Sequence, residues 1–266
     1  MRLAVPSLVL ALGLVAGCTD DGPAVPPEDE PTGVLVAVGD SVAAGAGDPA
    51  GGYPVRLAGL LEQPTACDGT PCPPMVLHQL AEGGATTGSL IEGGQLATAA
   101  ELLRASPAGA ARVVTVTVGG NDVVGPLATA CADGVTEECA AAVTERYATV
   151  QQGLQRILGA AREAGGDDAV LAVMTYYDSF VGCDLAALSP LVQRVLDGDP
   201  AAGLPSFNGL LAEVAGAHGA VVVGTRDLVG ADELVGGRDC LHPDADGHAR
   251  IAGAFADAVG PQLGRR

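Results

Sequence analysis

The sequence predicts an α/β domain, a three-layer αβα sandwich built around a central, mostly parallel sheet of five strands. From Gly33 onward, short apolar runs typical of buried strands alternate with longer stretches of helical periodicity. Strands that alternate with helices imply parallel pairing through right-handed crossovers, which leaves helices on both faces of the sheet. The chain has 266 residues, of which 48% are hydrophobic, so it is long enough to enclose one substantial core.

The five expected strands are short apolar runs, the first of which reads Val-Leu-Val-Ala-Val and ends abruptly in Gly39. They cover residues 34–38, 76–81, 113–118, 169–174 and 220–223. The helical stretches between and after them cover residues 53–61, 90–105, 139–164, 207–217 and 244–259. Residues 176–185 have the composition of a loop.

The N-terminus has the composition of an export signal. Arg2 precedes an apolar run of about 14 residues, which is too short to span a bilayer comfortably and is typical of a secretory signal peptide. Residues 14–18 (Leu-Val-Ala-Gly-Cys) resemble the lipobox of bacterial lipoproteins, in which cleavage precedes the cysteine and that cysteine is lipidated. An ordinary signal peptide in which Cys18 falls at this place by chance is the alternative.

The chain therefore divides into three parts. Residues 1–17 are the expected lipoprotein signal peptide. Residues 18–32 are the lipid-anchor Cys18 and a tether rich in Pro, Asp and Glu, and residues 33–266 are the folded domain. We expect a protein exported across the cytoplasmic membrane and held on its outer face by the lipid anchor.

Charge and composition exclude several function classes. Thirteen basic residues, all of them Arg, stand against 32 acidic ones, so the net charge is −19 and nucleic acid is not an expected partner. A chain without Lys has neither a Schiff-base lysine nor a Walker-type phosphate loop. With 3% aromatic residues and no Trp, stacking platforms for bases or sugars are not expected. Seven cysteines indicate an oxidising compartment.

Polar, Gly-rich turns follow the first three expected strands. They are residues 39–41 (Gly-Asp-Ser), 83–87 (Gly-Gly-Ala-Thr-Thr) and 119–122 (Gly-Gly-Asn-Asp). Because the carboxyl ends of parallel strands share one edge of a sheet, these turns should lie close together, where open α/β sheets bind ligands. Asp and Ser also cap helices routinely, so Asp40-Ser41 taken alone leaves capping open beside catalysis.

With a fourth block, Asp239-x-x-His242-Pro243, the chain resembles the GDSL/SGNH family of serine hydrolases (esterases and lipases), in its actinobacterial form. The four blocks occur in the family's order. The resemblance implies a flavodoxin-like sandwich and hydrolysis of carboxylic esters. The chain departs from the pattern near Gly84, where relatives often have Asn ahead of the glycine and this sequence has Gln79 and Glu82.

Chemistry requires these residue types independently of the resemblance. A serine hydroxyl is a poor nucleophile at neutral pH, so Ser41 needs a base, for which His242 is the best candidate. Asp239 would orient the imidazole and stabilise its protonated form. The oxyanion would be held by the amides of Ser41 and Gly84 and by the side chain of Asn121.

Neighbouring acidic groups are expected to play structural roles. We interpret Asp40 as a brace for its turn and Asp122 as a helix start. A metal cluster of Asp244, Asp246 and His248 is the alternative to a helix N-terminus there, and we expect neither a metal nor a cofactor.

If Cys18 is lipidated, six cysteines remain, with fifteen possible pairings. Spacing favours Cys67–Cys72, Cys131–Cys139 and Cys183–Cys240, and the resemblance implies the same order. The last bridge would tie the Asp239–His242 segment to the loop after the fourth strand. A free thiol at Cys240 is the alternative.

These observations lead us to expect a monomeric, lipid-anchored esterase or lipase acting on a small-molecule or lipid ester through an acyl-enzyme. A polysaccharide O-deacetylase or an acyltransferase with the same triad is one alternative. A non-catalytic envelope lipoprotein that serves as a binding module is another.

Overall fold

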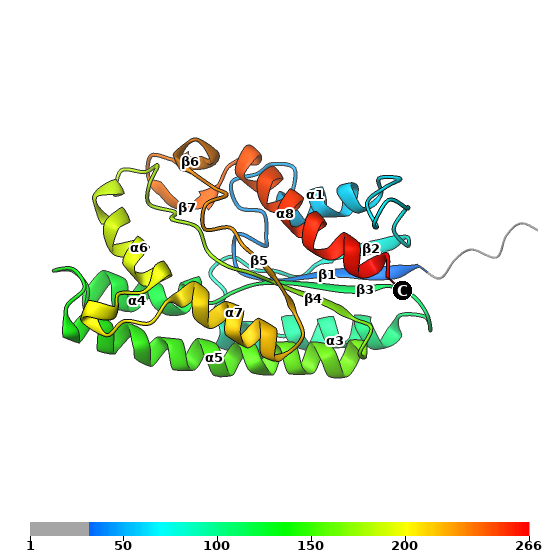
Figure 1. The fold of residues 1–266 in the computed structure, drawn as a ribbon, viewed down its shortest axis with the longest axis horizontal. Coiled ribbons are helices and arrows are strands. Elements are labelled where there is room, and N and C mark those ends of the chain that lie inside the picture. Colours follow the sequence, from blue (N-terminus) through cyan, green and yellow to red (C-terminus); the bar gives the residue numbers. More distant parts are fainter. Residues whose placement is uncertain (1–31, 266) are drawn as a thin grey trace, which may run out of the picture.

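A computed structural model describes residues 32–265 and contains the expected five-stranded sheet (Figure 1). The strands are β1 (Gly33–Gly39), β2 (Met75–Gln79), β3 (Arg112–Thr117), β4 (Val170–Met174) and β5 (Val221–Val223), in the order β2-β1-β3-β4-β5. Every pairing is parallel. The order is that of flavodoxin-like sheets, and it confirms the predicted fold class.

Helices cover both faces of the sheet (Figure 1). One face carries α1 (Gly52–Leu61) and α8 (Ala245–Leu263). The other carries α2 (Thr87–Glu92), α3 (Gln95–Ala105), α5 (Glu137–Gly165) and α7 (Phe207–Ala217). Between α1 and α8, the rings of Tyr53 and Phe255 stack with centroids 4.6 Å apart. All seven residues of β1 are buried between the two layers, which explains its uninterrupted apolar run.

Three expectations about helices need correction. The single helix expected over residues 90–105 is two helices, α2 and α3, because Gly93 and Gly94 interrupt it and Gly94 has φ +99°. Of α4 (Gly120–Thr129) only the start, at Asp122, was expected, and α6 (Ser189–Asp197) was not expected. Short 3₁₀ turns, η1 (Ala186–Leu188), η2 (Pro200–Ala202) and η3 (Ala231–Glu233), complete the connections.

A small antiparallel pair of strands, β6 (Leu234–Gly236) and β7 (Asp239–Pro243), was also not expected from the sequence. Gly236 and Gly237 form its turn with φ of +73° and +61°, values that favour glycine. The pair lies with α4 and α6 at the end of the molecule toward which the parallel strands run (Figure 1). His242 is therefore presented from a strand.

β2 pairs with one side of β1, and β3 pairs with the other side. The sheet therefore has a topological switch point between β1 and β3. Ligands of doubly wound folds bind outside the carboxyl ends of strands at such a point. The turns that contain Ser41 and Asn121 follow these two strands. The expected signal peptide, Cys18 and almost all of the tether lie outside the described residues. Of the helices within residues 32–265, none has both the length and the apolarity to cross a bilayer.

Candidate active site

The turn after β1 depends on a glycine. Gly39 has φ +142°, and a Cβ there would lie 2.0 Å from the carbonyl oxygen of Thr117 on the adjacent strand. The side chain of Gln95 holds this residue from both sides: its Oε1 accepts from the Gly39 amide (2.9 Å) and its Nε2 donates to the Gly39 carbonyl (3.2 Å). Sequence reasoning missed Gln95. The chain then leaves the sheet and carries Ser41 to its edge.

Ser41, His242 and Asp239 form a continuous hydrogen-bonded line. The Ser41 hydroxyl lies 2.8 Å from Nε2 of His242, and Nδ1 of the same ring lies 2.8 Å from Oδ2 of Asp239. Because the carboxylate can only accept, the ring proton sits on Nδ1 and Nε2 is free to accept from the serine. The three residues that the sequence nominated as nucleophile, base and orienter are thus brought together across 201 residues of chain.

Asp239 is held in its ionised form by the backbone around it. Its Oδ1 accepts from the amides of Leu241 (3.0 Å) and His242 (3.1 Å), a turn that folds the carboxylate back toward the imidazole. Partial burial works to raise the pKa of Asp239, but hydrogen bonds from the His242 ring and from these two amides outweigh it and lower the pKa below 3.8. A negative charge therefore faces the imidazole at neutral pH.

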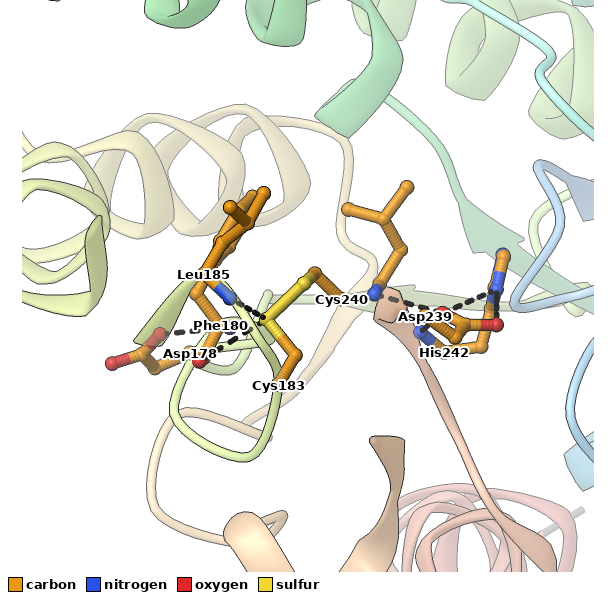
Figure 2. The surroundings of a disulfide bond; sticks show 8 residues. Asp178, Phe180, Cys183, Leu185, Asp239, Cys240 and His242 are labelled. Carbon is orange, nitrogen blue, oxygen red and sulfur yellow. Dashed lines mark hydrogen bonds and ion pairs between the residues drawn. A yellow bond between two sulfur atoms is a disulfide. The ribbon is translucent and has the colours of Figure 1, made fainter. Parts of the chain in front are cut away.

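A disulfide restrains the segment that carries this pair. Cys183 in the loop after β4 is bonded to Cys240 on β7, between Asp239 and His242, with Cα atoms 5.1 Å apart (Figure 2). The backbone amide of Asp184 also donates to the carbonyl of Gly237 (2.8 Å), so the two segments are joined twice. The other disulfides are Cys67–Cys72 and Cys131–Cys139, the pairs that the spacing favoured.

The turns after β2 and β3 are joined by the side chains of Asn121 and Asp122. Asn121 Nδ2 donates to the carbonyl of Ala85 (3.0 Å), the residue after Gly84. Asp122 accepts from both the amide (3.0 Å) and the hydroxyl (2.8 Å) of Thr87. The interpretation of Asp122 as only a helix start is therefore wrong. Gly84 is exposed and has φ +78°. These contacts hold the Gly84 turn against the start of α4.

Asp40, which holds the turn before the nucleophile, makes more contacts than the sequence indicated. Asp40 is buried, and its carboxylate accepts from the hydroxyl of Tyr176 (2.6 Å) and the amide of Val42 (3.0 Å). The Tyr176 hydroxyl in turn accepts from the Gly120 amide (3.2 Å). Burial raises the pKa of Asp40 to about 6, although these hydrogen bonds work to lower it. Tyr176, in a segment expected only to be a loop, thus connects two of the site's turns.

His248 has a structural role within α8. Its Nδ1 accepts from the Tyr53 amide (3.1 Å) and its Nε2 donates to the carbonyl of Ala46 (2.9 Å), at the end of the turn that begins at Ser41. Burial lowers the pKa of His248, which favours the neutral ring that this pattern requires. Asp244 caps α8 by accepting from the amides of Asp246 and Gly247. Two of the groups considered as metal ligands, Asp244 and His248, are thus occupied in capping and bracing.

An apolar cavity of about 100 Å³ opens beside the nucleophile. Ser41 and Asn121 are among its polar lining residues, and aliphatic and aromatic side chains, most of them from α4, α6 and α7, form most of its wall. A concave apolar site with a few convergent polar groups is the usual form of a small-molecule binding site.

Comparisons with known proteins agree with this fold. A lipase from a goat rumen metagenome, Lip_vut3, superposes with a TM-score of 0.63 at 19% identity over 87% of this chain and 100% of its own. An extracellular lipase from Streptomyces rimosus superposes with a TM-score of 0.58 at 20% identity, over 85% of this chain and 100% of its own. At these identities the likeness shows the fold. No curated protein matches the chain by sequence.

The sequence pattern of the GDSL-like Lipase/Acylhydrolase family matches residues 37–250. The match begins within β1, two positions before the turn that leads to Ser41, and it ends within α8, beyond His242. It therefore spans every strand-end turn described above and most of the chain. The chain belongs to the GDSL-like lipase/acylhydrolase family of carboxylic ester hydrolases.

Proposed function

We propose that the protein is an extracytoplasmic serine esterase that hydrolyses carboxylic esters through an acyl-enzyme on Ser41. The observation that carries the proposal is the line of hydrogen bonds from the Ser41 hydroxyl through His242 to Asp239, with 2.8 Å at each step. A serine, a neutral imidazole and an ionised carboxylate in this order are the parts that acyl transfer needs.

In the first half of the reaction, His242 Nε2 takes the proton of the Ser41 hydroxyl as its Oγ attacks the ester carbonyl carbon. Asp239 stabilises the imidazolium that results, without itself taking a proton. The tetrahedral intermediate collapses when His242 returns the proton to the leaving alcohol oxygen. The acyl group remains bonded to Oγ of Ser41.

In the second half, His242 takes a proton from water, whose oxygen attacks the acyl carbon. The second tetrahedral intermediate expels Oγ of Ser41, which recovers its proton from His242, and the carboxylic acid leaves. In both halves the oxyanion would be held by the amides of Ser41 and Gly84 and by Asn121 Nδ2. One such donor is typically worth about 3 kcal/mol of barrier.

The extracytoplasmic location is supported by the sequence of residues 1–18 and by the cysteines. Three disulfides join six of the seven cysteines, and disulfides persist in oxidising compartments. The seventh is Cys18, at the lipobox-like end of the signal. We propose that Cys18 is the lipidated N-terminus, so that the enzyme works on the outer face of the membrane.

Hydrolysis of a chromogenic short-chain ester tests the catalytic proposal. We expect turnover by the purified protein and a loss of about 10⁴-fold or more in kcat/KM for Ser41→Ala and for His242→Ala, with the circular dichroism spectrum unchanged. His78→Ala on β2 is the matched control and should retain full activity. A wild-type protein that only binds esters would point to a binding module, and a Ser41→Ala variant with near wild-type turnover would remove Ser41 from the mechanism.

A further inference from the structure

The cavity beside Ser41 has a polar end and an apolar end. Ser41 and Asn121 line it, whereas His242 and Asp239, which complete the hydrogen-bonded line, do not. The cavity therefore adjoins the nucleophile and does not include the base. Side chains of His242 and Asp239 are 20% and 32% exposed, so the side of the base meets solvent.

Burial distinguishes the mouth of the cavity from its floor. Val124 on α4 and Leu241 on β7 line it and are 42% and 40% exposed, so they lie toward the opening. Val195 and Leu196 on α6 and Phe207 on α7 also line it and are almost completely buried. The cavity is thus a blind recess that runs from the site into the core between these helices.

The geometry of acyl transfer decides which part of an ester enters this recess. In the tetrahedral intermediate, the central carbon carries four groups: Oγ of Ser41, the oxyanion, the leaving oxygen and the acyl chain. The oxyanion must face Asn121, and the leaving oxygen must face His242 Nε2 to receive its proton. The acyl chain takes the remaining direction. The recess adjoins Ser41 and does not include His242, so it is available to the acyl chain.

We propose that this recess is the acyl-binding pocket of the enzyme and that it selects unbranched aliphatic acyl groups of about four to six carbons, with little selection on the alcohol. The inference rests on the proposed function of Ser41. An apolar cavity of about 150 Å³ holds one benzene molecule, so one of about 100 Å³ has room for roughly four carbons beyond the reacting centre.

The lining also argues against an acetylated sugar as the preferred substrate. An acetyl group leaves most of the recess empty, so the mostly apolar wall adds little to the binding of an acetyl ester. The one carboxylate in the lining, Asp40, already accepts from Tyr176 and Val42. Each methylene buried in the recess should instead contribute to binding in the transition state.

A series of p-nitrophenyl esters from acetate to dodecanoate tests the inference on the wild-type protein. We expect kcat/KM to rise about fourfold for each added methylene up to four to six carbons and to fall for longer chains. Butyrate esters of phenols that have equal acidity but different bulk should differ in kcat/KM by less than about tenfold. A maximum at acetate, or a flat profile to twelve carbons, would overturn the acyl-pocket assignment. A protein that hydrolyses none of the esters would instead contradict the proposed function.

Two substitutions on α6 test the position of the pocket. Val192→Phe brings a ring into the recess and should lower kcat/KM for hexanoate by about tenfold or more while sparing acetate. Leu191→Phe is the matched control, because Leu191 is the neighbour on the same helix and does not line the recess, and its chain-length profile should remain that of the wild type.

Leu196→Ala is the complementary variant, which stays informative if Val192→Phe fails to fold. It removes part of the floor, so the preferred chain should lengthen by about two carbons. An unchanged chain-length profile in a folded Val192→Phe or Leu196→Ala protein would show that the acyl chain binds elsewhere.

Discussion

The hydroxyl of Tyr176 lies 2.6 Å from Oδ2 of Asp40, the residue immediately before Ser41. The same hydroxyl accepts from the amide of Gly120, immediately before Asn121. One side chain from the segment after β4 therefore connects the turn that presents the nucleophile with the turn that presents the expected oxyanion donor. Tyr176 is partly buried, and its ring packs against that of Phe207 with centroids 5.7 Å apart, which helps to hold the hydroxyl in place.

Replacing Tyr176 with Phe should destabilise the protein in a pH-dependent way. The pKa of Asp40 is about 6 in the fold against an ordinary 3.8, so its favourable contribution is fully present below about pH 4 and is lost as the pH rises through 6. At pH 8 the carboxylate is charged, and losing the Tyr176 hydrogen bond should cost about 1–3 kcal/mol. At pH 5, where Asp40 is mostly protonated, the cost should be smaller. Melting temperatures at the two pH values measure this.

Tyr177→Phe provides the control for that experiment. Its hydroxyl donates to the neutral carbonyl of Leu241 (2.8 Å), so its loss should cost similar stability at both pH values. Tyr176→Phe should also lower kcat, because active-site geometry tolerates errors of only about 0.5 Å. Equal destabilisation of Tyr176→Phe at pH 5 and pH 8 would show that the Asp40 charge does not matter to this contact.

Asn121→Ala should lower kcat by about 10²–10³, with little change in KM, because it removes a donor that acts on the developing oxyanion. The loss includes the hydrogen bond to Ala85, which holds the turn containing Gly84. Asp122→Ala separates the two effects: it frees the same turn at Thr87 without removing the donor, and we expect only about a tenfold loss. If Asn121→Ala changed only KM, the side chain would be a ground-state contact instead.

The double variant Cys183→Ser/Cys240→Ser should lose activity at temperatures where circular dichroism still reports a folded protein. The disulfide closes a 57-residue separation and is worth roughly 4 kcal/mol, but its particular effect is to restrain the segment that carries Asp239 and His242. Activity and melting temperature are measured on the same samples.

The pair Cys67→Ser/Cys72→Ser is the matched control. That disulfide closes a 5-residue separation just before β2 begins, whereas the Gly84 turn of the site follows the end of the same strand. It should cost roughly 2 kcal/mol of stability, with activity following the melting curve. A Cys183→Ser/Cys240→Ser variant that behaved in the same way would mean that the bridge stabilises the fold without positioning the triad.

The full-length protein, expressed in a bacterium that processes lipoproteins, should partition into the membrane fraction, and Cys18→Ser should move it out of the lipidated pool. Two or more acyl chains on one residue anchor a protein far better than one chain does. Mass spectrometry of the mature N-terminus checks the prediction. A mature chain that begins anywhere other than a lipidated Cys18 would contradict it.

Most of the sheet could be predicted because its buried parallel strands are short runs rich in apolar residues, and β1 and β3 lead into glycine-rich turns. The extent of α4 beyond its start at Asp122 was not predicted, because Gly119, Gly120 and Pro126 disguise its helical pattern. The β6–β7 pair was missed because strands of three and five residues carry too little periodicity to recognise. The break between α2 and α3 follows from adjacent glycines, whose effect on a helix depends on packing.

The site could be predicted where residues form local blocks, and it could not where a single side chain reaches across the fold. Ser41 and Asn121 each belong to a short pattern at a strand end, and Asp239 and His242 belong to one short pattern before the last helix. Tyr176 and Gln95 belong to none, and their contacts span 136 and 56 residues of sequence. A lone Tyr or Gln gives no local signal of such a partner.

The most direct test of the account is to trap the covalent intermediate on Ser41. A p-nitrophenyl alkylphosphonate should react once per molecule, release one nitrophenol and leave a stable phosphonyl group on the nucleophile. Intact-mass and peptide mass spectrometry should place that group on Ser41 in the wild type, find none in Ser41→Ala, and show much slower labelling in His242→Ala. Labelling of another residue, or ester hydrolysis by a protein whose Ser41 stays unmodified, would contradict the account.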